Sequence, residues 1–281
     1  MDILKGAAVS AAIKEELLQK RKQLGEIIPK LAIIRVGEKP DDVSYERGAT
    51  KKMESVGIQV ESHVFPEDIS NEAFFDAFQK INADKTVDGL LVLRPLPSHI
   101  CEKDLERYID PKKDVDGIGI ENMSKIYAGD ESGYAPCTAQ AVMEMLHHIH
   151  LPLGGKRVVI IGRSLVLGRP LAMLLLKENA TVTICHSHTT NLKQVCKEAD
   201  VVIAAIGKAK AITREYLSEG AMVIDVGVNM DEDGKLCGDV DFENVQDMVS
   251  CITPVPGGVG VVTTTVLAKH VIAGALEKQN Q

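Results

Sequence analysis

Residues 157–170 read RVVIIGRSLVLGRP and begin with a pattern that is typical of a buried parallel strand. Residues 157–161 are mostly β-branched and apolar, and Gly162 then ends the strand. From Arg169 onward apolar residues recur at helical spacing, and Pro170 suits the first turn of a helix. A strand, a glycine-rich turn and a helix in this order point backbone N–H groups at a phosphate. The stretch favours a dinucleotide-binding turn, and an ordinary tight turn is the alternative.

The turn departs from the dinucleotide fingerprint G-x-G-x-x-G in two ways. Ser164 stands in place of the middle glycine, and the segment from Gly162 to Gly168 is one residue longer. No Gly-Lys-Ser/Thr sequence follows, so the turn is not a P-loop. A glycine-rich turn alone is weak evidence for dinucleotide binding, so the next predicted strand is needed to distinguish the two interpretations.

The next predicted strand, residues 180–185, carries no acidic residue at its end. In an NAD site an Asp or Glu at this place holds the ribose 2′-hydroxyl. Here Ser187 and Thr189 offer hydroxyl groups, and Arg163 supplies a positive charge, a set that accepts a 2′-phosphate. The pattern therefore predicts NADP rather than NAD. An alternative is that residues 187–190 cap the helix that follows.

Strands and helices alternate along the chain, which predicts an α/β fold with parallel sheets. The predicted strands are residues 31–36, 58–65, 87–93, 157–161, 180–185, 200–205 and 222–226, with a short one near Cys251. The predicted helices are residues 1–20, 43–56, 71–82, 139–150 and 263–277, with further ones after Arg169 and near Leu192. Residues 109–134 are polar and show little periodicity, so we interpret them as the approach to a second domain.

Composition excludes several classes of protein. The 281 residues suffice for two domains, and 45% of them are apolar, which is typical of a globular protein. The net charge is −8 and no basic run is present, so nucleic-acid binding is not expected. No run approaches the roughly 18 apolar residues of a membrane helix, and the acidic, amphipathic N-terminus is unlike a signal peptide. No membrane contact is expected.

Cysteines and histidines do not form a metal-binding pattern. The six cysteines are scattered without a C-x-x-C pair, which favours reduced thiols and a cytoplasmic location. The histidines of residues 147–150 end a predicted helix, where the helix dipole favours them. We expect no metal site.

Several motifs together resemble one family, the methylenetetrahydrofolate dehydrogenase/cyclohydrolase enzymes of one-carbon metabolism. The motifs, whose order and spacing are specific, are KDVDG from Lys113, PCT from Pro136, GRSLVLGRP from Gly162, CHSHT from Cys185, VIDVGVN from Val223, GDVDF from Gly238 and TPVPGGVG from Thr253. They cover nearly the whole chain.

The resemblance implies two α/β domains that flank a cleft, the second of them a Rossmann-type NADP-binding domain. It places an N-terminal folate-binding and catalytic domain at residues 1–135, joined by the C-terminal helix 263–281, and the NADP-binding domain at residues 136–262. It also implies a homodimer, tetrahydrofolate derivatives as substrates and NADP as cofactor.

The resemblance assigns roles to individual residues. Tyr45 and Asp116 are expected to be catalytic and to bind the substrate, with Asp116 on the pterin ring. A carboxylate suits the paired donors of a pterin, although Asp116 could instead hold the turn around it. Gly257 and Gly258 are expected at the substrate. The cofactor residues implied are Gly162, Arg163, Ser164, Ser187 and Val228, the last beside the nicotinamide.

Two departures from the family pattern concern the hydrolytic step. The family has a Lys four residues after the Tyr, on the same helix face, where this chain has Ala49. It also has a Gln in a V-Q-L-P-L-P turn, where this chain has Leu93. We therefore expect the cyclohydrolase step to be lost or very weak. Lys52 lies about two turns beyond Tyr45 and is interpreted as solvated. A further departure is Val261, where the family has Pro.

Three hypotheses stay open at this point. The first is an NADP-dependent dehydrogenase that forms 5,10-methenyltetrahydrofolate and stops there. The second is a fully bifunctional enzyme that makes 10-formyltetrahydrofolate with a rearranged base such as Lys52, or Arg94 with water. The third is a non-catalytic regulator that binds NADP or folate.

Overall fold

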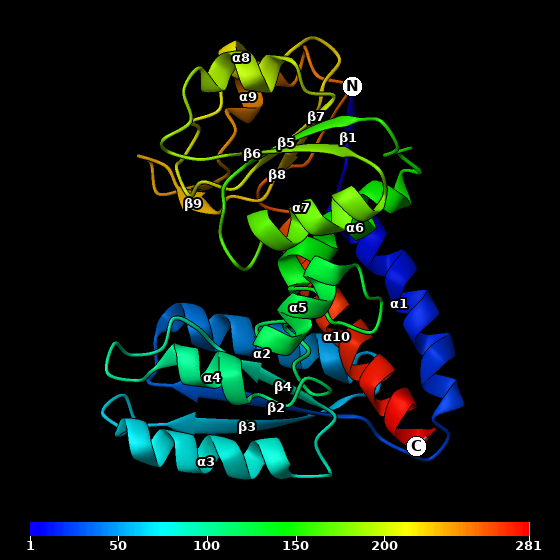
Figure 1. Cartoon of the computed structure of the whole chain (residues 1–281), viewed down its shortest axis with the longest axis vertical. Coiled ribbons are helices and arrows are strands. Elements are labelled where there is room, and N and C mark those ends of the chain that lie inside the picture. The colour runs from blue at the N-terminus through cyan, green and yellow to red at the C-terminus, as the bar shows by residue number, and fades with distance from the viewer. Residues whose placement is uncertain (281) are drawn as a thin grey trace. The chain divides into compact units, whose positions relative to one another are not determined.

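The protein divides into two compact units, which a computed structural model describes over residues 1–280. Unit 1 comprises Met1–Ala11 and Thr138–Thr263, and unit 2 comprises Ala12–Cys137 with the residues from Thr264 onward. Two of the three unit boundaries fall inside the first helix, α1 (Gly6–Gln23), and the last, α10 (Val259–Gln279), and the third follows Cys137, the first residue of α6. Both units are α/β, as the alternation of strands and helices predicts (Figure 1).

Unit 1 is built on one parallel sheet. Its strands lie in the order β1 (Asp2–Ile3), β11 (Cys251–Ile252), β8 (Met222–Asp225), β7 (Val201–Ala204), β5 (Arg157–Ile161) and β6 (Thr181–Cys185). Every neighbouring pair is parallel. From β5 the chain crosses first to β6 on one side and then to β7 on the other. Ligands bind at such a switch point, beyond the carboxyl ends of the strands.

The remaining elements of unit 1 follow or connect these strands. They are α6 (Cys137–His148), α7 (Gly168–Lys177), α8 (Leu192–Lys197), the short 3₁₀ helix η1 (Arg214–Tyr216), α9 (Phe242–Val245) and an antiparallel hairpin of β9 (Asn229–Met230) and β10 (Leu236–Cys237). A buried apolar cluster joins the strands to the helices, with Val159, Val202 and Val223 from the sheet and Cys196 and Val245 from α8 and α9.

Unit 2 contains a three-stranded parallel sheet. Its strands lie in the order β3 (Gln59–Phe65), β2 (Lys30–Val36) and β4 (Gly89–Val92). Its helices besides the parts of α1 and α10 are α2 (Pro40–Glu54), α3 (Asn71–Ala83), α4 (Glu102–Tyr108) and α5 (Ile120–Ala128). Phe74 and Phe78 of α3 are fully buried in one apolar cluster with Ala32 and Ile34 of β2.

The structure differs from the sequence prediction in three places. The N-terminus, predicted as one helix of the folate-binding domain, begins with strand β1, and Met1–Ala11 belong to unit 1. A two-residue strand has no periodicity to reveal it. Residues 109–134, predicted to be irregular, contain α5, which buries only Asn122 and Ile126. The last helix begins four residues earlier than predicted, at Val259, and is longer.

Helix α10 is long and apolar enough to cross a membrane by length and composition, which the sequence analysis did not anticipate. More than half of its most apolar window (56%) is buried inside the protein. A largely buried apolar helix is typical of a protein core, so its composition reflects packing against protein.

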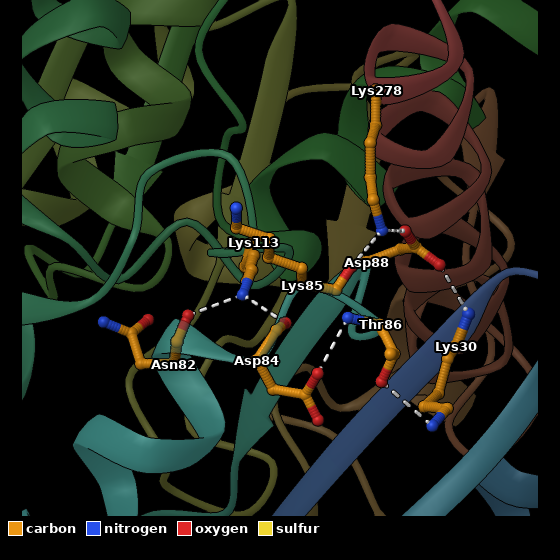
Figure 2. Close-up of polar contacts among 8 residues, drawn as sticks. All are labelled: Lys30, Asn82, Asp84, Lys85, Thr86, Asp88, Lys113 and Lys278. Carbon is orange, nitrogen blue, oxygen red and sulfur yellow. Dashed lines mark hydrogen bonds and ion pairs between the residues drawn. The ribbon is translucent and has the colours of Figure 1, made fainter.

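The end of α10 is held at the amino edge of the unit 2 sheet, as Figure 2 shows. Lys278 Nζ lies 2.7 Å from Asp88 Oδ1 and also donates to the Lys85 carbonyl. The second oxygen of Asp88 accepts from the Lys30 backbone N–H at 2.8 Å. Lys113 Nζ donates to the carbonyls of Asn82 and Asp84. These contacts tie the loop before β4 to two other elements of unit 2.

We predict that Lys278→Met lowers the free energy of unfolding by about 1–2 kcal/mol, because it leaves the nearly buried Asp88 carboxylate without its cation. Urea unfolding followed by circular dichroism measures the change. Lys80→Met, at an exposed position of α3, is the control and should shift the value by less than 0.5 kcal/mol or so. Equal values for the two variants would contradict the prediction.

Candidate active site

Tyr45 and Asp116 lie close together in unit 2. Tyr45 is on α2, and its side chain is 39% exposed. Desolvation of the phenol, and then the charges of Asp116 and Cys137, raise the pKa of Tyr45 well above its usual value. The phenol is therefore protonated throughout the neutral pH range, and it can donate a hydrogen bond but cannot accept a proton from water.

Asp116 is the acid of this site. Burial raises its pKa to about 6, while Arg94 and a hydrogen bond with Cys137 act in the opposite direction. Arg94 follows β4, and its guanidinium lies 4.0 Å from Glu106 with little exposure. At neutral pH Asp116 is therefore mostly ionised, beside a cation that the sequence analysis mentioned only as an alternative base.

The turn around Asp116 is held by a different carboxylate. Asp114 is fully buried and accepts hydrogen bonds from the backbone N–H groups of Ile118 and Gly119, at 2.9 and 2.8 Å. It also accepts from Asn122 Nδ2 at 2.9 Å. Asp114 therefore organises the turn that carries Asp116.

The charged groups that shift the pKa of Tyr45 are Asp116 and Cys137, and neither is basic. Ala49, one turn further along α2, is fully buried, and Leu93, directly after β4, is nearly so. Lys52 has a pKa that is lowered by desolvation and by Lys14 of α1. A cation beside a phenol lowers the pKa of the phenol. The pKa of Tyr45 is raised instead, and Lys52 is not among the groups that shift it.

The glycine-rich turn of unit 1 lies at the switch point after β5. Gly162 has φ of +141°, and a Cβ there would lie 2.4 Å from the Ala205 carbonyl oxygen. A Cβ on Gly168 would lie 2.1 Å from the Gly162 carbonyl oxygen. Both positions therefore require glycine, and the turn brings backbone close to the start of α7. No side chain caps this helix, so its first turn can face an anion.

The residues predicted to read the ribose phosphate are exposed near this turn. Arg163 and Ser164 are exposed directly after Gly162, and Ser187 is exposed after β6, the strand that pairs with β5. Thr189 instead accepts from the His186 N–H at 2.8 Å. The alternative that residues 187–190 cap the next helix is wrong, because α8 has Asn191 as its N-cap residue and no side-chain cap.

Val228 and the two predicted substrate glycines also belong to unit 1. Val228 follows β8 and is 67% exposed, which is unusual for an apolar residue in a loop held by buried neighbours. Gly257 has φ of +103°, and its carbonyl oxygen accepts from the Gly6 N–H at 2.9 Å. A Cβ on Gly258 would lie 2.5 Å from the Pro254 carbonyl oxygen. Tyr45 and Asp116, in contrast, belong to unit 2.

Two groups of residues near these sites were not singled out from the sequence. Cys137 is buried, and its thiol donates to the Val115 carbonyl, close to Asp116. Asp225 and Asp239 are buried at the carboxyl edge of the unit 1 sheet. They lie in the motifs VIDVGVN and GDVDF. A separation of 14 residues in the sequence does not reveal that each acid binds the loop that carries the other. Within residues 1–280 no group of three His, Cys, Asp or Glu side chains could hold a metal ion.

Comparison with protein families gives two matches that together cover most of the chain. The model of the tetrahydrofolate dehydrogenase/cyclohydrolase catalytic domain matches residues 4–116. The model of the NAD(P)-binding domain of the same family matches residues 136–279. The chain is also 50% identical to the bifunctional protein FolD of Clostridioides difficile over 281 residues, 99% of this chain and 98% of that protein.

Solved structures agree with these matches. The bifunctional FolD enzyme of Campylobacter jejuni superposes with a TM-score of 0.96 and 40% identity, over 99% of both chains. The dehydrogenase-cyclohydrolase of Trypanosoma brucei, solved with NADP and an inhibitor, has a TM-score of 0.93 and 32% identity, over 99% of this chain and 98% of that one. The fold, the two domain matches and the full-length relatives agree, and the chain belongs to the tetrahydrofolate dehydrogenase/cyclohydrolase family.

Proposed function

We propose that this protein is an NADP-dependent 5,10-methylenetetrahydrofolate dehydrogenase whose product is 5,10-methenyltetrahydrofolate, and that it has lost most or all cyclohydrolase activity. The observation that carries the proposal is the surroundings of Tyr45. Burial of the phenol, and then the charges of Asp116 and Cys137, raise its pKa and keep it protonated. The positions at which the family has Lys and Gln are filled by Ala49 and Leu93.

Asp116 binds the pterin in this proposal. Its ionised carboxylate accepts from the 2-amino group and the N3–H, which are both donors. Tyr45 lies beside it and donates from its protonated hydroxyl to the folate. Both residues orient the ligand, and orientation of the methylene carbon is the main demand of a hydride transfer. The step needs no side-chain proton, because the flanking folate nitrogens stabilise the product cation.

The turn after β5 holds the cofactor. Gly162 and Gly168 leave room for a pyrophosphate at the uncapped start of α7, and Arg163 and Ser187 are exposed where a 2′-phosphate would lie. Bound NADP would supply the hydride acceptor, and Val228 is the exposed apolar residue expected beside its nicotinamide. No acidic residue stands among the exposed residues after β6, which supports NADP over NAD.

Hydrolysis of the methenyl product requires more of the protein than oxidation does. Water adds to the methenyl carbon, and its proton must leave for a base, which contributes about 10²–10⁴-fold. Tyr45 cannot accept that proton, because its raised pKa keeps the hydroxyl protonated at neutral pH. The relatives named bifunctional favour the alternative that both steps occur, and this alternative requires a base that acts from another position. Lys52 of α2 has a lowered pKa, which suits a base, but it lies two helical turns from Tyr45.

The remaining expectations of assembly and location belong to the same proposal. We propose a homodimer in the cytoplasm that acts on tetrahydrofolate derivatives and binds neither nucleic acid nor membrane. The net charge of −8 supports the expectation of no nucleic-acid binding, and the burial of α10 supports the expectation of no membrane binding. A binding-only regulator is disfavoured, because the chain retains both Asp116 and the cofactor turn.

The pH dependence of catalysis tests the role of Asp116. Since burial raises its pKa to about 6, its charge is present above pH 6 and is lost as the pH falls through 6. We expect kcat/KM for methylenetetrahydrofolate to fall about tenfold per pH unit below this value. Arg94→Leu should move the midpoint to higher pH, because the cation that favours the carboxylate is removed.

Arg107→Leu, which removes an exposed cation on α4, serves as the control and should leave the midpoint unchanged. A midpoint near pH 4 in the unmodified protein, or the same midpoint in Arg94→Leu, would show that Asp116 does not titrate as described.

Cofactor preference tests the role of Arg163. Arg163→Ala should weaken NADP binding by the 1.5–3 kcal/mol or so that a charge-assisted hydrogen bond supplies, and it should leave NAD binding nearly unchanged. Isothermal titration with each cofactor gives both values. Arg157→Ala, an exposed arginine at the opposite edge of the same sheet, should change neither. Equal losses of binding free energy for NADP and NAD in Arg163→Ala would show that Arg163 does not bind the 2′-phosphate.

The missing base is tested by adding methenyltetrahydrofolate to the enzyme and following its absorbance. We predict hydrolysis close to the rate in buffer alone. Ala49→Lys with Leu93→Gln should restore part of the activity, and either single change less, because the two groups act as a pair. Since Ala49 is fully buried, the thermal midpoint of each variant must be measured beside its rate. Hydrolysis well above the buffer rate by the unmodified protein would overturn the proposal.

A further inference from the structure

Two buried acids of unit 1 bind an unusual number of N–H groups. Asp239 is fully buried, and its Oδ2 accepts from the backbone N–H groups of Ile206 and Gly207, at 2.6 and 3.2 Å. Its Oδ1 accepts from the Lys208 N–H at 2.8 Å and from Asn229 Nδ2 at 2.9 Å. Every lone-pair position of this carboxylate therefore has a donor, and the donors come from two separate loops.

Asp225 completes the arrangement at the end of β8. Its Oδ1 accepts from the backbone N–H groups of Gly227 and Asp239, both at 3.0 Å, and its Oδ2 accepts from the Val240 N–H at 2.8 Å. The Asp225 N–H donates to Thr253 Oγ1 at 2.7 Å. Asp225 thus holds the backbone that carries Asp239, and Asp239 holds the loops on either side of it.

Two glycines make this arrangement possible and fix its geometry. A Cβ on Gly227 would lie 2.2 Å from Asp239 Cγ, and a Cβ on Gly238 would lie 1.9 Å from Asp225 Oδ2. Each carboxylate therefore fills the space above a glycine in the loop that carries the other. A side chain at either glycine would push a carboxylate away from its donors, because buried neighbours leave no alternative position.

The loops held in this way border the parts of the cofactor site. Residues 205–208 follow β7 and lie against the glycine-rich turn, since a Cβ on Gly162 would meet the Ala205 carbonyl at 2.4 Å. Residues 226–229 follow β8 and carry Val228. Strands β5, β7 and β8 are parallel neighbours, so all three segments lie at the carboxyl edge of the same sheet (Figure 1).

We infer that Asp225 and Asp239 are positioning residues for hydride transfer, which hold residues 205–208 and 226–229 of unit 1 in the geometry that the bound nicotinamide requires. This inference rests on the proposed dehydrogenase function. Neither acid acts on a substrate atom. Their effect comes through the backbone of the loops beside Val228 and Gly162. Misplacement of reacting groups by about 1 Å can reduce a rate by about 100-fold.

The variant Asp239→Asn tests the inference with the smallest change of shape. An amide has one oxygen and one NH₂ group, and each side of Asp239 faces two N–H donors. Whichever way the amide turns, its NH₂ group meets two donors. In Asp225→Asn the oxygen can still accept from Gly227 and Asp239, so only the Val240 contact is lost.

We expect kcat to fall about 10–100-fold in Asp239→Asn and by less in Asp225→Asn, with KM for methylenetetrahydrofolate unchanged. The deuterium isotope effect measured with substrate labelled at the methylene carbon should rise, because hydride transfer becomes the slow step. A purely structural role would lower the thermal midpoint and the fraction of active protein without raising the isotope effect. Asp200→Asn, a carboxylate on the Arg157 N–H at the amino edge of the sheet, should change kcat less than twofold or so.

A milder variant covers the case in which Asp239→Asn does not fold. Asn229→Ala removes one bond to Asp239 and keeps the carboxylate, and it should lower kcat with a raised isotope effect in a folded protein. Unchanged kcat and isotope effect in Asn229→Ala and in any folded Asp239→Asn would overturn the inference. Unmodified protein that forms no NADPH from methylenetetrahydrofolate would instead overturn the proposed function, so the two failures are distinguishable.

Discussion

Buried carboxylates that gather backbone N–H groups are the interaction on which both sites depend. In unit 2 Asp114 accepts from Ile118, Gly119 and Asn122 and so fixes the turn that carries Asp116. In unit 1 Asp225 and Asp239 do the same for the loops after β7 and β8. An ionised carboxylate offers acceptors only, and loop N–H groups at the end of a parallel sheet are donors without a strand partner. Unit 2 meets this need with Asp114, and unit 1 meets it with Asp225 and Asp239.

The positions of the acids also explain how one fold can keep one reaction and lose another. In the proposed function, oxidation depends on the orientation of two ligands, a task assigned to Asp116 and to the loops that carry the cofactor site. Hydrolysis depends in addition on a base beside Tyr45. The residues at position 49 of α2 and position 93 after β4 determine whether this base is present. Ala49 is fully buried and Leu93 nearly so. In the proposed function, the residues at these two positions are enough to remove the base of the hydrolytic step.

The sequence predicted the periodic elements well and the connections between distant residues poorly. Strands such as β5 and β2 have apolar, β-branched runs, and the α/β class followed from the alternation of strands and helices. The division into two domains followed from the chain length, the polar residues 109–134 and the family resemblance. Strand β1 has two residues and depends on its pairing with β11, a partner about 250 residues away that no local pattern shows. Arg94 and Cys137 could not be linked to Asp116 from the sequence for the same reason, because electrostatic neighbours are set by tertiary packing. The roles of Asp225 and Asp239 likewise depend on hydrogen bonds between separate loops.

The central claim is that the chemistry of this site ends at the methenyl product. A single progress curve in which NADPH and methenyltetrahydrofolate are quantified together tests it most directly. The account predicts that the two products accumulate in a ratio of one to one until the substrate is used, apart from the slow loss of methenyl compound that buffer alone causes. NADPH that accumulates while the methenyl compound is converted to 10-formyltetrahydrofolate in proportion to enzyme concentration would contradict the account.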